Sequence, residues 1–132
     1  MTARARPTLF LRFKLGADAQ IGPGKIELLE AIAREHSIAA AARSMSMSYR
    51  RAWLLVDSMN RMFATRVVVA RPGRQPGKSA ELAPYGARLV DGFRRAEGRA
   101  TRACSGFVDL MMDEFRGQDR IATPRKRTSN GR

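Results

Sequence analysis

The sequence is poor in the residues that build most catalytic and metal sites. Its 132 residues include one cysteine, Cys104, and one histidine, His36. The two lie far apart in the sequence, and neither belongs to a cluster with metal-ligand spacing. A single cysteine excludes an internal disulfide, which agrees with a reducing compartment. No pair of carboxylates stands out as an acid–base pair. The sequence therefore argues against an enzyme and predicts neither a metal nor a cofactor.

Acidic residues and long apolar runs are scarce as well. The chain has 12 Asp and Glu against 25 Lys and Arg, a formal net charge of +13. No apolar run approaches the roughly 20 residues that a membrane span needs, and the basic N-terminus leads into no signal-peptide hydrophobic segment. We expect a cytoplasmic protein with no membrane partner. A charge excess of this size points to a polyanionic partner, with nucleic acid first and an anionic membrane surface second.

A nucleotide-binding P-loop is also missing. Residues 70–82, ARPGRQPGKSAEL, contain a Gly-Lys-Ser, but only three residues separate Gly73 from Gly77, whereas the motif needs four. Pro76 also removes a backbone donor from the part that would cradle phosphate. This basic, glycine-punctuated segment suits the phosphates of DNA better than the tail of a nucleotide.

Hydrophobic patterning predicts short strands and helices followed by one long helix. Residues 8–15 alternate as a half-buried strand does, and residues 24–37 have helical spacing. Ser37 and Ser48 are N-cap candidates for the two helices that follow. Residues 65–72 and 79–84 read as two paired strands. We expect buried helix faces at the following positions: Ile26, Leu29, Ile32 and Ala33 in the first helix, and Ala52, Val56, Met59 and Phe63 in the third.

This order of elements predicts a winged helix-turn-helix over residues 8–84, a mainly α fold with a small β-sheet. Ala42 stands where two helices cross closely, and Ala52 packs from the next helix. Ser46 occupies the tight turn, where glycine is usual because the backbone there is left-handed. His36 is predicted to cap the end of the first helix.

The helix that begins at Ser48 is then the recognition helix, whose first residues reach base edges in the major groove. Arginine forks there can bind guanine bidentately. Whether Tyr49 and Trp53 contact bases or the core stays open. The predicted DNA-binding residues are Ser48, Tyr49, Arg50, Arg51 and Trp53 on the recognition helix, with Ser37 at a helix start and Arg71, Arg74 and Lys78 on the wing as phosphate contacts.

Residues 85–116 predict one long dimerisation helix. Apolar and small residues step alternately by four and three positions, the average of 3.5 that marks a coiled-coil seam. The alternative is a helix folded back on its own domain. Residues 1–7 are predicted to be a flexible N-terminus and residues 117–132 a basic disordered tail. The predicted seam consists of Leu89, Phe93, Ala96, Ala100, Ala103, Phe107 and Leu110.

Three segments, GPGKIELLEAI, SIAAAARSMSMSYRRAWLLVDSMN and ELAPYGARLV, resemble the N-terminal DNA-binding domain of the molybdate-responsive ModE-type regulators. More distantly they resemble LysR-type winged helices. The resemblance implies a homodimeric transcriptional regulator on a palindromic operator, frequently at genes for molybdate uptake or molybdenum enzymes. Full-length family members carry molybdate-binding modules after this domain. We expect none in this chain, which leaves a separate effector-sensing protein as a candidate partner.

Two other functions remain open on sequence grounds. A non-specific architectural protein would use the same basic surface with little base selectivity. A partner-binding module would use the winged helix as a protein-docking surface. Arginines at the start of a groove-reading helix favour sequence-specific binding over both.

Overall fold

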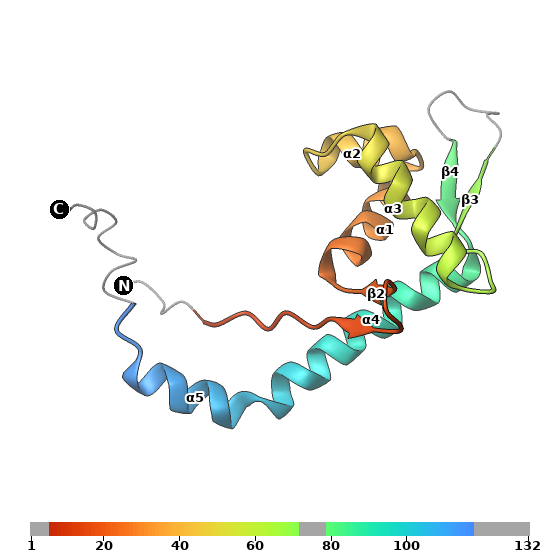
Figure 1. Cartoon of the computed structure of the whole chain (residues 1–132). Helices are drawn as coiled ribbons and strands as arrows, with labels where there is room; N and C mark the ends of the chain where they lie inside the picture. The colour runs from red at the N-terminus through yellow and green to blue at the C-terminus, as the bar shows by residue number, and fades with distance from the viewer. Residues whose placement is uncertain (1–5, 72–78, 118–132) are drawn as a thin grey trace. The chain divides into compact units, whose positions relative to one another are not determined.

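The structure is a computed structural model that describes residues 6–71 and 79–117. These residues belong to two units: one runs from Phe10 to Glu97, and the other consists of the residues before and after it (Figure 1). Arg74 and Lys78 of the predicted wing lie outside the described residues, as do most of the predicted flexible N-terminus and of the predicted tail.

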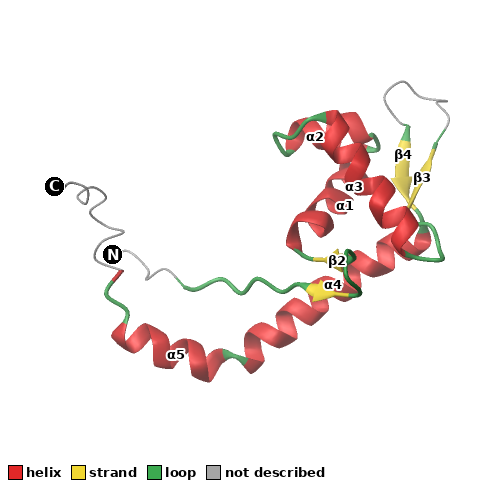
Figure 2. Cartoon of the chain, in the orientation of Figure 1, coloured by secondary structure: helices red, strands yellow, loops and turns green. Residues whose placement is uncertain are grey.

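The chain is mainly helical with two small antiparallel hairpins, and the predicted fold class is confirmed (Figure 2). The order of elements is that of a winged helix. Along the chain they are β1 (Phe13–Lys14), β2 (Gln20–Ile21), α1 (Pro23–Glu35), α2 (Ile38–Ser44), α3 (Tyr49–Met62), β3 (Val68–Ala70), β4 (Ala80–Leu82), α4 (Pro84–Ala103) and α5 (Ser105–Glu114).

Helix α1 forms the centre of the core. Ile26, Leu28, Leu29 and Ile32 are completely buried, because α1 packs against both α2 and β4. This wide buried face takes in Leu28, which the predicted stripe did not include. The prediction that Ala33 belongs to the buried face is wrong, since Ala33 is exposed.

The helix-turn-helix has the predicted internal contacts. Ala42 and Ala52 are buried, so α2 and α3 approach closely at two small side chains. Ser46 has φ 55°, the left-handed conformation expected of the turn. The Ser46 N–H donates to the Arg43 carbonyl at 3.1 Å, and the Met47 N–H donates to the Ala42 carbonyl at 3.0 Å. The turn is therefore closed by its own backbone despite having serine where glycine is usual.

Both predicted serine caps are confirmed. The Ser37 hydroxyl accepts the Ala40 N–H at 3.0 Å, and the Ser48 hydroxyl accepts the Arg51 N–H at 3.0 Å. His36 ends α1 through its backbone, with φ 61° and its N–H donating to the Ile32 carbonyl.

The wing hairpin pairs as predicted, with Val68 opposite Leu82 and Ala70 opposite Ala80. The strand predicted over residues 8–15 is largely wrong, because only Phe13 and Lys14 are paired and Leu15 is exposed. Its partner β2 has only two residues. The turn that joins the two strands is closed by a hydrogen bond from the Leu15 N–H to the Ala19 carbonyl at 2.7 Å, so neither strand can extend into it.

The single helix predicted over residues 85–116 is also wrong, because the chain forms α4 and α5 with a break at Cys104 (Figure 2). The Cys104 N–H is shared between the Ala100 and Thr101 carbonyls, a pattern typical of helix ends. Near its start, α4 passes so close to the chain before β3 that a Cβ on Gly86 would collide with the Val67 carbonyl oxygen. Glycine is therefore required there.

Candidate nucleic-acid interface

Helix α3 presents one face to the core and the other to solvent. Ala52, Val56 and Met59 are buried, which fixes the rotation of the helix. The predicted recognition residues Tyr49, Arg50, Arg51 and Trp53 are all exposed. The guanidinium groups of Arg50 and Arg51 make no ion pair within residues 6–71 and 79–117. Two uncompensated cations therefore stand at the capped start of α3.

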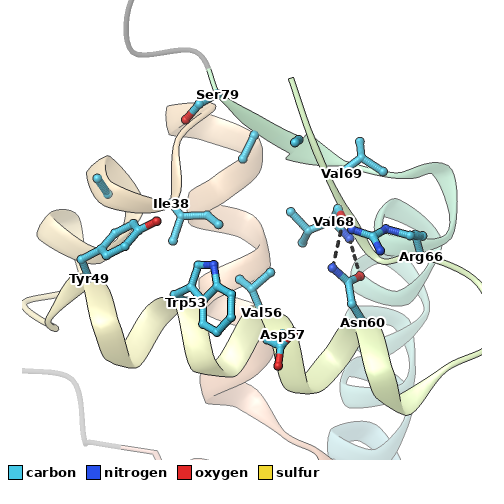
Figure 3. Close-up of a pocket in the computed structure, with 13 residues that line it drawn as sticks. Ile38, Tyr49, Trp53, Val56, Asp57, Asn60, Arg66, Val68, Val69 and Ser79 are labelled. Carbon is cyan, nitrogen blue, oxygen red and sulfur yellow. Dashed lines mark hydrogen bonds between the residues drawn. The ribbon is translucent and has the colours of Figure 1, made fainter. Parts of the chain in front are cut away.

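Trp53 and Tyr49 lie on the side of α3 that faces the wing. Trp53 is 45% exposed and Tyr49 is 55% exposed, and neither belongs to the hydrophobic core. The alternative in which Trp53 mainly fills the core is therefore not the arrangement that the structure has. One turn apart on the same helix, the two rings form one wall of a groove (Figure 3).

The groove runs between α3 and the wing hairpin and has a volume of about 490 Å³. Its lining mixes two kinds of side chain, aromatic and aliphatic groups on one hand and polar or charged groups on the other (Figure 3). The apolar members include Ile38, Val56 and Val68, and the polar members include Asp57, Asn60, Arg66 and Ser79.

Asn60 fastens the wing to the recognition helix, a role that the sequence analysis missed. Its side-chain oxygen accepts the Val67 N–H at 2.8 Å and the Val68 N–H at 3.1 Å. Its amide nitrogen donates to the Val68 carbonyl at 3.1 Å, shown dashed in Figure 3. An asparagine late in a helix is an unfavourable choice on propensity alone, and that mismatch was the available signal.

The charged residues around the groove differ in whether they are paired. Arg61 pairs with Asp57 at 3.1 Å, and Arg71 pairs with Glu81 across the hairpin at 2.5 Å. Arg71, predicted as a phosphate contact, thus has an acidic partner within its own wing. Arg66, which the sequence analysis did not select, lines the groove and has no hydrogen bond or ion pair to another described residue.

The two serines predicted to meet phosphates are placed differently. Ser48 is exposed, and its hydroxyl proton remains free to donate while the oxygen caps α3. Ser37 is 7% exposed, and its hydroxyl is engaged inside the domain by the Ala40 N–H. A phosphate contact through the Ser37 hydroxyl does not fit this placement, because the side chain is buried away from the surface that a phosphate could reach.

The predicted dimerisation residues do not share one environment. Within the unit Phe10–Glu97, Leu89, Phe93 and Ala96 line an apolar groove of about 350 Å³ together with Phe13 and Tyr85. Phe93 is itself buried and meets Phe13 edge-on, with ring centroids 6.1 Å apart. In the other unit, the exposed members are Ala103, Phe107 and Leu110, and Ala100 is half-buried.

Arg94 binds α4 to α1 inside the same unit. Its Nε and Nη2 atoms donate to the two carboxylate oxygens of Glu30 at 3.0 and 2.9 Å, and its Nη1 atom donates to Glu97 at 2.7 Å. The hydrogen bond from Arg94 lowers the pKa of the Glu30 carboxyl, against a smaller opposing effect of burial. The first half of α4 is thus part of the folded domain.

Two further kinds of site can be checked in the part of the chain that the structure describes. Within residues 6–71 and 79–117, no three His, Cys, Asp or Glu side chains gather as a metal site would require. Among those residues there is also no helix long and apolar enough to cross a membrane.

Comparison with known proteins gives a consistent set of relatives. The molybdenum-pterin-binding protein MopA of Rhodobacter capsulatus is 42% identical over 84 residues, which are 64% of this chain and 32% of MopA. The molybdenum transport protein ModE of Azotobacter vinelandii is 36% identical over 88 residues, covering 64% and 33% of the two chains. The DNA-binding transcriptional dual regulator ModE of Escherichia coli K12 is 37% identical over 90 residues, covering 68% and 33%.

The chain thus spans about a third of the length of the curated relatives it matches. No family model matches it.

Proposed function

We propose a DNA-binding transcriptional regulator, on the premise that this chain belongs, over about its N-terminal two thirds, to the ModE-type family of molybdate-responsive regulators. The observation that carries the proposal is the start of α3. Arg50 and Arg51 stand there exposed and unpaired within the described chain, on a helix whose rotation is fixed by its buried face.

The recognition helix reads the major groove of double-stranded DNA in this proposal. An arginine fork that meets guanine O6 and N7 contributes about 1–3 kcal/mol of discrimination against other bases. Ser48 donates its hydroxyl to a backbone phosphate beside that contact. The wing residues Arg71, Arg74 and Lys78 supply sequence-independent attraction to the phosphates. The contribution of Arg71 is smaller, because Arg71 is ion-paired with Glu81.

We place the dimer contact on the apolar faces of α4 and α5. The groove lined by Leu89, Phe93 and Ala96 is open, and Phe107 and Leu110 are 61% and 66% exposed. Exposed apolar surface of this kind marks an interaction site more often than a free face. A two-fold dimer of winged helices binds an inverted repeat, with half-sites about one helical turn or a multiple apart.

Molybdenum metabolism is the proposed setting of the regulated genes, because the names of the relatives refer to molybdenum transport and molybdenum-pterin binding. This chain matches about a third of those proteins. We therefore propose that any signal reaches these residues from another module or from a separate effector-sensing protein. The names of the relatives favour this regulator over the non-specific architectural alternative.

Selection from a random duplex pool, at near-physiological salt and against excess competitor DNA, tests the proposal. The expected result is an enriched inverted repeat. Arg50→Ala is expected to weaken binding to the selected site by about 1–3 kcal/mol and to relax selectivity at particular base pairs. Arg95→Ala is the control, because Arg95 lies exposed on α4 and pairs with Asp91.

A pool that remains featureless while the protein still binds DNA would favour the architectural alternative. Retained dimerisation without any DNA binding would favour a protein-docking module.

A further inference from the structure

We propose that the groove between α3 and the wing hairpin is a subsite for one sugar–phosphate strand of duplex DNA, contacted by Trp53 and Arg66. This inference rests on the proposed function, because it assumes that α3 approaches duplex DNA. It adds a backbone contact beside the base-reading residues and assigns a role to an arginine that the sequence pattern did not single out.

The groove has the lining that a deoxyribose-phosphate strand needs. Its aromatic wall is made by Tyr49 and Trp53, and its floor includes Ile38, Val56 and Val68 (Figure 3). Sugar rings are weakly polar and pack against such surfaces, whereas an isolated anion gains nothing from them. The two half-exposed aromatic rings lie outside the core and give a bound strand an apolar surface to cover.

Hydrogen-bond donors that have no partner among the described residues line the same space. Neither the indole N–H of Trp53 nor the hydroxyl of Tyr49 is hydrogen-bonded to another described residue. In Figure 3 both polar atoms turn toward Ile38 and the space beside it. Phosphate oxygens are acceptors, so an indole or phenol donor at the rim fits them.

Arg66 supplies the positive charge. It stands in the connection between α3 and β3 and is exposed, while the neighbouring Arg61 and Arg71 are each held by an acid. Asp57, the one acid among the described residues that line the groove, is engaged by Arg61 at 3.1 Å, which reduces its repulsion of a phosphate. Arg66 thus keeps its whole charge for a ligand, and its fork suits a phosphate bidentately.

One end of the groove is held together by the protein itself. Asn60 ties α3 to Val67 and Val68, at the start of β3, through three hydrogen bonds, two of them accepted by one oxygen. Because these bonds exist before a ligand arrives, the protein loses less conformational freedom at this end when a strand binds.

Trp53 is the sole tryptophan of the chain, so its fluorescence reports on this groove directly in the unmodified protein. We would titrate the protein with a duplex carrying its selected site, following fluorescence anisotropy of the labelled DNA and the emission of Trp53 together. The expected result is a shift of tryptophan emission that saturates with the anisotropy. Inorganic phosphate at the same concentrations is expected to leave the emission unchanged.

The salt dependence of the same binding tests Arg66. Arg66→Ala is expected to reduce the slope of log K against log salt by about one unit and to weaken all sequences alike. The matched control is Arg95→Ala, which should leave the slope unchanged. Circular dichroism verifies that each variant is folded, and the emission of the unmodified protein does not depend on any variant.

Different outcomes separate the two proposals. DNA binding with unchanged Trp53 emission and an unchanged slope for Arg66→Ala would overturn the groove assignment and leave the regulator intact. Saturation of the emission change by phosphate alone would replace the strand with a free-anion site. An absence of DNA binding by anisotropy would overturn the proposed function itself.

Discussion

Helices α4 and α5 carry the two halves of one predicted apolar seam, and the chain uses them differently. In α4, Phe93 is buried and packs edge-on against Phe13, and Arg94 holds Glu30 of α1. In α5, no residue is buried, and Phe107 is 61% exposed. The same residue type at equivalent seam positions therefore serves the folding of the domain in one helix and is left open in the other.

This difference shows what helical periodicity can and cannot establish. A step of 3.5 residues predicts that one side of a helix is covered. It does not say whether the cover comes from the same domain or from another chain. In α4 the domain itself covers Phe93, whereas Leu89 and Ala96 line a groove that stays open. For α5 the proposed dimer supplies the cover.

The largest expected effect on stability comes from replacing Phe93 with alanine. Phe93→Ala is expected to lower the free energy of unfolding by about 3 kcal/mol or more, because it empties a buried site. Phe107→Ala is the matched control and should change it by no more than about 0.5 kcal/mol. Urea unfolding at several protein concentrations measures both.

Phe107→Asp extends this test to the dimer. It should leave the domain folded but reduce the mass seen in light scattering to that of a monomer. A Phe107→Ala variant as unstable as Phe93→Ala would break the comparison between the two helices.

A smaller effect is expected at the arginine that fastens α4. Arg94→Ala should lower the free energy of unfolding by at most about 1 kcal/mol, since both partners are partly exposed. Arg95→Ala, whose ion pair with Asp91 lies in solvent, should change it by a few tenths.

The effect of Arg94→Ala should depend on pH. Arg94 lowers the pKa of Glu30 in the folded state. The stabilisation is therefore complete above the ordinary Glu pKa of 4.5 and is lost as pH falls through the lowered value. Thermal unfolding between pH 7 and pH 3 should show the difference between Arg94→Ala and the unmodified protein shrinking in acid. A difference that grows on acidification would contradict the assigned ion pair.

The smallest effect is expected from two helical glycines. A Cβ at Gly92 in α4 or at Gly106 in α5 meets nothing within 4 Å, so alanine fits at both. Gly92→Ala should raise the free energy of unfolding by up to about 1 kcal/mol, from helix propensity and a less flexible unfolded chain. Gly106→Ala should add helical circular dichroism without stabilising the domain. Equal stabilisation by both would show that α5 unfolds together with the domain.

Local rules predicted much of the winged helix. Ser37 and Ser48 cap helices because their short hydroxyls reach the N–H three residues on, and Ser46 takes the left-handed turn that its position between two helices demands. Such features depend on a few neighbouring residues. The prediction of the first strand was wrong because it used residues 8–15 alone. Their alternation does not indicate how long the partner strand is, and β2 has two residues.

The groove could not be predicted in the same way. The sequence left open whether Trp53 contacts bases or the core, and its half-exposed position beside the wing depends on how β3 docks against α3. That docking uses hydrogen bonds between the Asn60 side chain and the backbone of Val67 and Val68, seven and eight residues further along the chain. A contact of this kind leaves no periodic signal in the sequence. The pairing of Arg71 with Glu81 likewise depends on the hairpin register. Arg66, in contrast, lines the groove without a partner among the described residues.

The sequence by itself determined the basic character of this protein, the positions of its helix starts and its turn, and the face of α3 that is buried. Charge, capping and periodicity are local or summed properties, so they can be read without coordinates. The tertiary structure alone decided which apolar residues of α4 are covered, which arginines keep a free charge, and that α3 and the wing enclose a groove. Those outcomes depend on which groups far apart in the sequence come into contact. The apolar face of α4, which packs in part against the domain, and the exposed apolar face of α5 share the same sequence pattern.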